Sequence, residues 1–251
     1  MSDAVSTYIF IYRLAPENRC NNLRYESENY FSENFAAEFR LLIWQNMLTI
    51  HYEDKARVTF EIARRRAHLF VKMLMMGRAF FNFSERPLDY YPTQWVEFQP
   101  QIQRVVVGNI SHEPNPDTQH PDNKSFSESE KILPLVSEHA SLRRALEDFV
   151  SSMSEASPDA YFYAYRTVED IRSHFQASDE DTDRKSAWNT MNNTLGYREE
   201  DYDELVRLSE KHRHGKIDEF IDPKSASRQL AFVRGMLERF IRYLAAEQVD
   251  A

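Results

Sequence analysis

Apolar and polar positions in the first hundred residues follow two different periods, which predict strands and then one long helix. Residues 8–12 form an aromatic and β-branched run typical of a strand. Residues 48–53 alternate apolar and polar side chains, which is the period of a half-buried strand. From Ala56 to about Phe80 the apolar residues recur three, four or seven positions apart, which predicts a helix with Asp54 as its N-cap.

Aromatic residues follow Pro87 and precede another apolar run. We expect the aromatic segment to be a loop, and its rings are Tyr90, Tyr91 and Trp95. Residues 102–107 are rich in β-branched side chains and predict a further strand that ends at Gly108. A small sheet packed on one long helix accounts for this part of the chain, so residues 1–108 are predicted to form an α+β domain.

Residues 109–130 are dominated by Pro, Asn, Asp, Ser, His and Lys and contain almost no apolar residue. That composition is typical of a linker between domains. Metal-capable side chains occur within it, namely those of His112, Asp117, His120 and Asp122. Because nothing in the pattern fixes their geometry, we expect no metal site there, and we expect no other cofactor.

Residues 131–251 show helical periodicity throughout and predict an all-α domain. Its expected helices cover about 135–153, a segment starting at Ser157, a short segment ending at Gly196, about 199–214 and about 225–247. Short connections between them favour an antiparallel bundle of about five helices. The complete prediction is therefore an α+β fold with an N-terminal mixed half and a C-terminal helical half.

Composition narrows the classes of function. The single cysteine, Cys20, excludes an intramolecular disulfide and a cysteine-rich zinc site, which favours a reducing, cytoplasmic location. The net charge of −9 excludes a protein that binds nucleic acid through bulk positive charge, although a local basic groove remains compatible with it. The most apolar stretch, residues 68–83, contains two charged residues and is too short to span a membrane.

The end of the fourth predicted helix has the most informative spacing. Four residues separate Arg207 from His212, and six separate it from His214. At about 100° per residue, His214 lies within about 20° of Arg207, whereas His212 lies about 140° away. With Leu205 at the centre of the buried stripe, Tyr202, Ser209 and His212 are expected to face inward, and Arg207, Lys211 and His214 outward.

An arginine and a histidine are sufficient to cleave RNA without a metal ion. The histidine transfers protons to and from the reacting oxygens, and the arginine stabilises the charge that develops on the phosphate. The spacing resembles the Arg-x(4–6)-His signature of HEPN domains, which are helical bundles of prokaryotic toxin and antiviral-defence proteins. Over residues 131–251 the resemblance implies a metal-independent endoribonuclease that acts as a homodimer on RNA. Its catalytic residues would be Arg207, His212 and His214, with Lys211 and Arg213 binding phosphate.

Two other interpretations of the same residues stay open. Arg207, Lys211 and His214 also fit a solvated helix end, where the helix dipole favours basic side chains. Alternatively, the bundle is a non-catalytic scaffold or sensor that dimerises through its helices and binds a protein partner through the N-terminal half.

Arg64, Arg65 and Arg66 are a second basic cluster, within the long N-terminal helix. Three consecutive side chains spread over about 200° of a helix, so they cannot all face one ligand. They predict either contacts with phosphate or RNA, or exposed arginines whose apolar stems cover the core. The rings at Tyr90, Tyr91 and Trp95 likewise fit either base stacking or core packing. Motifs of P-loop NTPases, dinucleotide-binding enzymes and zinc proteases are absent from the sequence.

Overall fold

The chain divides into two compact units, one comprising Met1–Asn82 and Leu88–Lys131, and the other Phe83–Pro87 and Ile132–Ala251. The computed structural model describes residues 6–15, 24–27, 30–32, 37–54, 58–82, 87–98, 121–154, 159–178, 181–213 and 223–250. Within these ranges, no helix combines the length and apolar character that crossing a membrane requires.

The N-terminal unit contains an antiparallel sheet with the order β2-β4-β5-β1-β6, to which β3 adds by pairing with β4. Its strands are β1 (Ser6–Ala15), β2 (Arg24–Glu26), β3 (Tyr30–Ser32), β4 (Ala37–Trp44), β5 (Met47–Asp54) and β6 (Asp89–Phe98). Burial alternates along β4 and β5, so every second side chain enters the core. The alternation predicted for residues 48–53 is confirmed, because Leu48, Ile50 and Tyr52 are fully buried.

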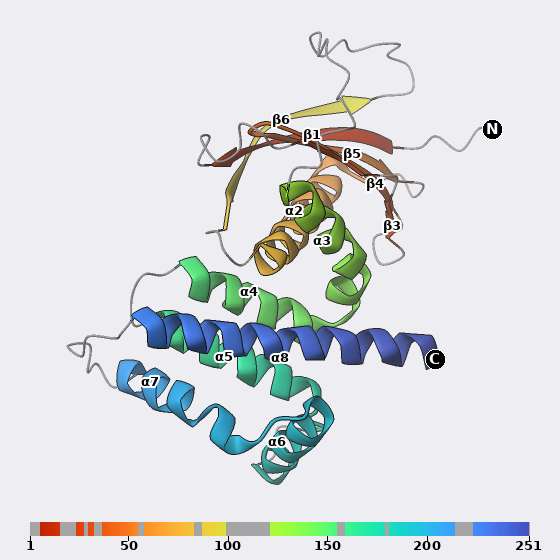
Figure 1. The fold of residues 1–251 in the computed structure, drawn as a ribbon. Helices are drawn as coiled ribbons and strands as arrows, with labels where there is room; N and C mark the ends of the chain where they lie inside the picture. Colours follow the sequence, from red (N-terminus) through yellow and green to blue (C-terminus); the bar gives the residue numbers. More distant parts are fainter. Residues whose placement is uncertain are drawn as a thin grey trace. The chain divides into compact units, whose positions relative to one another are not determined.

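Helix α2 (Phe60–Phe81) lies across the buried face of this sheet (Figure 1). The ring of Phe70 on α2 stacks on Phe39 of β4, with centroids 4.4 Å apart. The prediction that Asp54 caps this helix is wrong, because Asp54 is the buried last residue of β5. Thr59 is the N-cap instead, and its hydroxyl accepts a hydrogen bond from the Ile62 amide.

Two further expectations for the N-terminal half need correction. The aromatic segment after Pro87 is strand β6 rather than a loop, and it pairs with β1 along the edge of the sheet. Residues 121–130, predicted as linker, form the first part of helix α3 (Pro121–Glu138). Phe126 and Ser129 of α3 are buried, and the Ser129 hydroxyl donates to the Leu74 carbonyl at 2.6 Å. Residues 102–120, which include the predicted strand at 102–107 and most of the predicted linker, lie outside the described residues.

The second unit is helical. Besides the end of α3 it contains α4 (Ala140–Ser154), α5 (Asp159–His174), α6 (Asp181–Leu195), the short 3-10 helix η2 (Glu199–Asp201), α7 (Asp203–Arg213) and α8 (Pro223–Asp250). The long helix α8 crosses α4 and α5 (Figure 1). The helical periodicity predicted for about 225–247 is confirmed along α8, where Val233, Leu237, Phe240 and Leu244 form a stripe of fully buried side chains.

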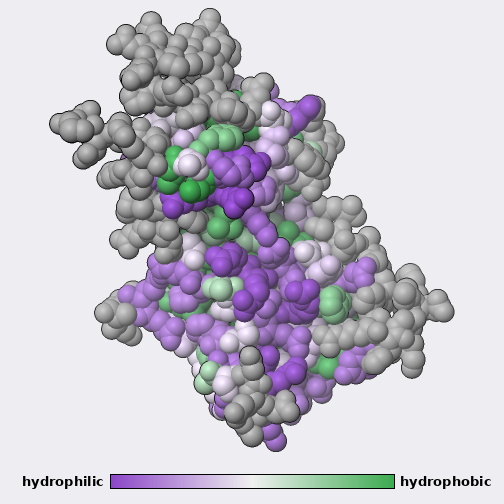
Figure 2. Space-filling view, turned by 180° about the vertical axis from the view of Figure 1, so that it is seen from behind, coloured by the Kyte–Doolittle hydropathy of each residue, from purple (hydrophilic) through white to green (hydrophobic). Residues whose placement is uncertain are grey.

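The α+β class is confirmed, and the helix boundaries differ from the prediction in detail. The expected first helix is divided at His139, between α3 and α4. The expected third helix is α6, and Gly196 follows it with a φ of 69°, the left-handed conformation that glycine adopts without steric cost. On the face of this unit that Figure 2 presents, hydrophilic side chains predominate and hydrophobic ones are scattered.

Candidate functional site

A pocket of about 540 Å³ opens between α2 and the strands β1 and β6 of the N-terminal unit. This volume lies within the range of small-ligand sites. Its lining consists of Phe10, Ile11, Tyr12, Phe60, Glu61, Arg64, Arg65, His68, Leu69, Lys72, Pro92 and Thr93. The buried β1 residues Phe10, Ile11 and Tyr12 form the floor, and the basic members all come from α2. An apolar floor beneath a cationic rim distinguishes the pocket from an ordinary surface hollow.

An irregularity in the sheet shapes the strand side of the pocket. The pairing of β1 with β6 shifts in register between Ile11 and Tyr12, so that Thr93 faces no partner of its own. Its hydroxyl donates to the Ile11 carbonyl at 3.0 Å. Pro92 has no amide hydrogen to give to the ladder, which suits a bulge. The bulge leaves Pro92 and Thr93 exposed at the pocket mouth.

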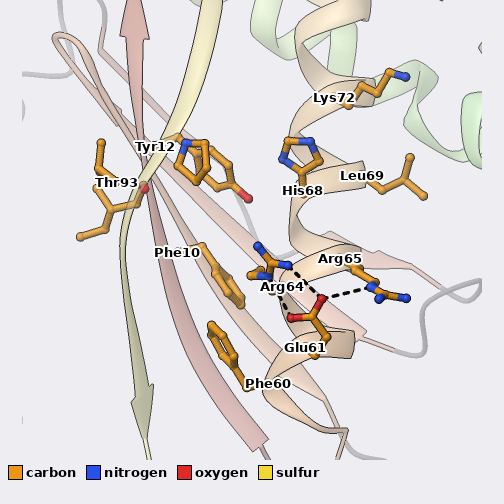
Figure 3. Close-up of a pocket in the computed structure, with 12 residues that line it drawn as sticks. Phe10, Tyr12, Phe60, Glu61, Arg64, Arg65, His68, Leu69, Lys72 and Thr93 are labelled. Carbon is orange, nitrogen blue, oxygen red and sulfur yellow. Dashed lines mark hydrogen bonds and ion pairs between the residues drawn. The ribbon is translucent and has the colours of Figure 1, made fainter.

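Helix α2 supplies the basic rim through its periodicity. Arg64, His68 and Lys72 are spaced four residues apart and therefore follow one side of the helix. Arg64 and His68 point toward β1, whereas Arg65 and Leu69 point away from the strands (Figure 3). Arg64, Arg65 and His68 are exposed, and Lys72 is half-buried. The third arginine, Arg66, does not line the pocket, because it turns to the buried Asp54 of β5.

Glu61 is the acidic member of the lining, and two guanidinium groups hold its carboxylate. Arg64 donates from Nε and Nη2 to the two carboxylate oxygens at 3.1 and 2.9 Å. Arg65 donates from Nε to Oε1 at 3.2 Å. The hydrogen bond from Arg64, more than any other contact, holds the pKa of Glu61 below its usual range, so the group is an anion at neutral pH. The helix thus already binds one oxyanion at the rim.

His68 occupies the inner part of the rim and contacts two tyrosine rings. It stacks on Tyr12, with centroids 6.2 Å apart, and lies 5.8 Å from the ring of Tyr90. Burial lowers the pKa of His68 below its ordinary value, and the positive charges of Lys72 and Arg64 lower it further. Burial also raises the pKa of Tyr12, so its hydroxyl stays protonated. His68 is therefore neutral at neutral pH and gains a proton readily only if an anion arrives beside it.

Three of the four residues predicted to face inward at α7 are described, and all three are buried. Tyr202, Leu205 and Ser209 are buried, and Arg207 is exposed. Three other predicted site residues lie on α7, namely Lys211, His212 and Arg213. The structure describes their backbone and not their side chains. His214 lies beyond the described residues altogether.

Only part of the pocket was predictable from the sequence. Arg64 and Arg65 were candidates for phosphate contact, and the three consecutive arginines were not expected to share one face. The hydrogen bond of Arg66 to Asp54 confirms that separation. Glu61, His68 and Lys72 were not predicted, although the four-residue spacing of Arg64, His68 and Lys72 is visible in the sequence. Tyr90 contacts Tyr12 and is half-buried, so it belongs to the packing around the pocket.

Among the described residues, no group of three or more His, Cys, Asp or Glu side chains is arranged to hold a metal ion. The pocket chemistry consists instead of guanidinium, ammonium and imidazole groups around an apolar cavity. Groups of this kind bind an oxyanion that carries a planar or apolar portion.

A family model described as "Domain of unknown function (DUF8168) C-terminal domain" matches residues 130–245. The helical unit is therefore similar to a recognised domain whose description carries no activity. The match leaves the strands and α2, and hence the pocket, outside its range. No curated protein and no solved structure matches the chain.

Proposed function

We propose that this protein is an RNA-binding effector whose N-terminal unit holds RNA in the pocket between α2 and β1. The observation that carries the proposal is the placement of Arg64, His68 and Lys72 along one edge of an apolar, ring-lined cavity. RNA presents a phosphate beside each planar base. Recognition of single-stranded RNA relies on cations for the phosphates and on aromatic or apolar surfaces for the bases.

The charge distribution supports local rather than extended binding. A chain with a net charge of −9 repels a long nucleic acid over most of its surface. The pocket contains Arg64, Arg65 and Lys72 against the single carboxylate of Glu61. Attraction is therefore concentrated at one short segment of RNA, and the affinity is expected to depend only modestly on salt.

In this proposal the helical unit acts on the bound RNA, as the HEPN resemblance of α7 implies for an effector of a prokaryotic defence or toxin system. Exposed Arg207 would stabilise the phosphate, with Lys211 and Arg213 binding neighbouring phosphates. His214 or His212 would take the proton of the ribose 2′-hydroxyl, whose oxygen attacks the adjacent phosphorus. The bond to the 5′-oxygen breaks and that oxygen is protonated, which leaves a cyclic 2′,3′-phosphate and a 5′-hydroxyl. Pairing of two α7 helices in a homodimer would bring two such sets together.

The binding test compares two arginines that are matched in environment. Arg64 lies at the pocket and is 55% exposed, and Arg40 lies on β4 and is 56% exposed; each is paired with a glutamate. We expect Arg64→Gln to weaken binding of a short single-stranded RNA about tenfold or more, and Arg40→Gln to leave it unchanged. If a fluorescence anisotropy titration gives equal affinities for the wild type and Arg64→Gln, the proposal that RNA binds at the pocket is wrong.

The cleavage test uses the full chain and labelled RNA. Arg207→Ala and His214→Ala are each expected to abolish cleavage, and a metal chelator is expected to leave the wild-type rate unchanged. If the wild type binds RNA at the pocket and does not cut it, the chain is a binding protein, and the ribonuclease part of the proposal is wrong. Loss of cleavage on chelation would refute the Arg/His mechanism.

A further inference from the structure

The carboxylate of Glu61 occupies the position at the pocket rim where an anionic ligand would be bound. It accepts hydrogen bonds from Arg64 at both oxygens and from Arg65 at one (Figure 3). The planar fork of a guanidinium group binds carboxylates and phosphates by the same paired geometry. A phosphate group that reached this rim would therefore compete with Glu61 for the same donors.

Glu61 can be displaced because its contacts lie at the surface. Its side chain is 47% exposed, and those of Arg64 and Arg65 are 55% and 77% exposed. Exposed ion pairs at three- and four-residue spacing on a helix contribute little to stability. The release of Glu61 to solvent consequently costs the fold little, whereas its negative charge opposes an incoming anion for as long as it remains at the rim.

The cavity beside this rim has room for the rest of a nucleotide. Its volume of about 540 Å³ exceeds that of a base and a ribose, and its inner surface is formed largely by apolar groups. A base that entered the cavity would meet the half-buried ring of Phe60, which stacks on Phe10, and the exposed imidazole of His68, which stacks on Tyr12. Phe10 and Tyr12 are 3% and 2% exposed, so they form the floor of the cavity and offer no stacking face.

We propose, resting on the proposed function above, that the pocket binds one nucleotide at a time and that Glu61 is a built-in competitor for its phosphate. The phosphate takes the place of the Glu61 carboxylate on Arg64 and Arg65, and the base enters the cavity between α2 and β1. The nucleotide belongs either to an RNA strand or to a free mononucleotide, because both present the same chemistry at the rim. Glu61 thereby sets the threshold concentration at which the site fills.

The experiment measures equilibrium binding of the full chain to three probes: a short single-stranded RNA, adenosine monophosphate and inorganic phosphate. Glu61→Gln keeps the shape of the side chain and removes its charge. This variant is expected to bind the RNA, adenosine monophosphate or both about five to ten times more tightly than the wild type does. Glu128→Gln is the matched control. Glu128 also forms an ion pair on a helix surface, with Lys131 three positions away, and it does not line the pocket. Its affinity is expected to equal that of the wild type.

The outcomes separate this inference from the proposed function. Tighter binding of adenosine monophosphate by Glu61→Gln identifies a free nucleotide as sufficient, and a gain seen only with RNA identifies a nucleotide within a strand. If the wild type binds RNA through Arg64 but Glu61→Gln binds no more tightly, the competitor role is wrong and the RNA site stands. If neither protein binds RNA or mononucleotide, both proposals are wrong. Equal gains with inorganic phosphate and with nucleotide would overturn the role of the cavity in binding the base.

Discussion

Arg66 donates from Nη1 to Oδ2 of Asp54 at 2.6 Å and thereby joins α2 to the end of β5. Asp54 is fully buried, and it also accepts a hydrogen bond from the Tyr52 hydroxyl at 2.5 Å. Together with the apolar face of α2, which buries Ala63, Ala67 and Phe70, this contact orients the helix on the sheet. Because Arg66 is held against the sheet, its neighbours Arg64 and Arg65 are turned to the pocket and its outer rim.

Removal of Arg66 is therefore expected to cost stability, whereas removal of Arg65 is not. Arg66→Met leaves the Asp54 carboxylate buried without its cation, which should lower the free energy of unfolding by about 2–4 kcal/mol. Arg65 is 77% exposed, and Arg65→Met should change it by no more than about 0.5 kcal/mol. Urea unfolding of both variants checks the difference. Similar stabilities for the two would contradict the anchoring role of Arg66.

Gly77 on α2 leaves room for α3. A Cβ atom at this position would lie 2.3 Å from the Ser129 hydroxyl oxygen and 3.2 Å from the Ser129 Cα. Gly77→Ala should therefore destabilise the chain by about 1–3 kcal/mol through overpacking, even though alanine favours a helix. At Gly235 on α8, the nearest atom to such a Cβ is 3.6 Å away, the Tyr197 hydroxyl oxygen. Gly235→Ala should raise the melting temperature slightly, and a fall comparable to that of Gly77→Ala would contradict this account.

The periodic parts of the fold were predictable because burial enforces a period. Residues 48–53 and the stripe of α8 were identified from alternation and helical spacing alone. The Asp54 prediction failed because an aspartate after a strand and before a helix fits an N-cap locally, and only the tertiary partner Arg66 shows that it is buried. Strand β6 was missed because it contains Pro92 and begins at an aromatic segment, and its pairing with β1 is non-local.

The pocket was only partly predictable for the same reason. The spacing of Arg64, His68 and Lys72 is visible in the sequence, but it does not show which side of α2 meets the sheet. That orientation depends on the packing of the apolar face of α2 on the sheet and on the contact of Arg66 with Asp54, and the floor depends on β1, some fifty residues earlier in the chain. Segment 121–130 was predicted as linker because its composition is polar, although Phe126 is buried and the buried Ser129 donates a hydrogen bond to Leu74 of α2.

Asp148 on α4 gives the helical unit a dependence on pH. Burial raises its pKa to about 7, and the neighbouring Asp170 adds to the rise, against the opposing charge of Arg166 at 2.9 Å. A carboxyl whose pKa is raised on folding stabilises the fold when protonated, so stability falls as the pH rises from about 4 to about 7. Asp148→Asn should remove this loss. Its melting temperature should exceed that of the wild type at about pH 8 and approach it at about pH 5. An equal difference in melting temperature between Asp148→Asn and the wild type at the two pH values would contradict the raised pKa of Asp148.

If the pocket binds RNA as proposed, His68 should make that binding stronger at lower pH. Its pKa is lowered in the free protein by burial and by Lys72 and Arg64, and a bound phosphate raises it. Binding therefore takes up a proton, and affinity should increase several-fold between about pH 8 and about pH 6. His68→Gln should abolish that increase while Arg64-dependent binding remains. An unchanged pH dependence in His68→Gln would show that another group takes up the proton.

The location of bound RNA tests the central claim most directly. A short thiouridine-substituted RNA, cross-linked to the full chain by light and located by peptide mass spectrometry, reports which residues the bases touch. We predict cross-links on the segment of α2 that contains Phe60 and His68, with marked loss in Arg64→Gln and none in Arg40→Gln. Cross-links confined to the helical unit, unaffected by Arg64→Gln, would contradict an RNA site between α2 and β1.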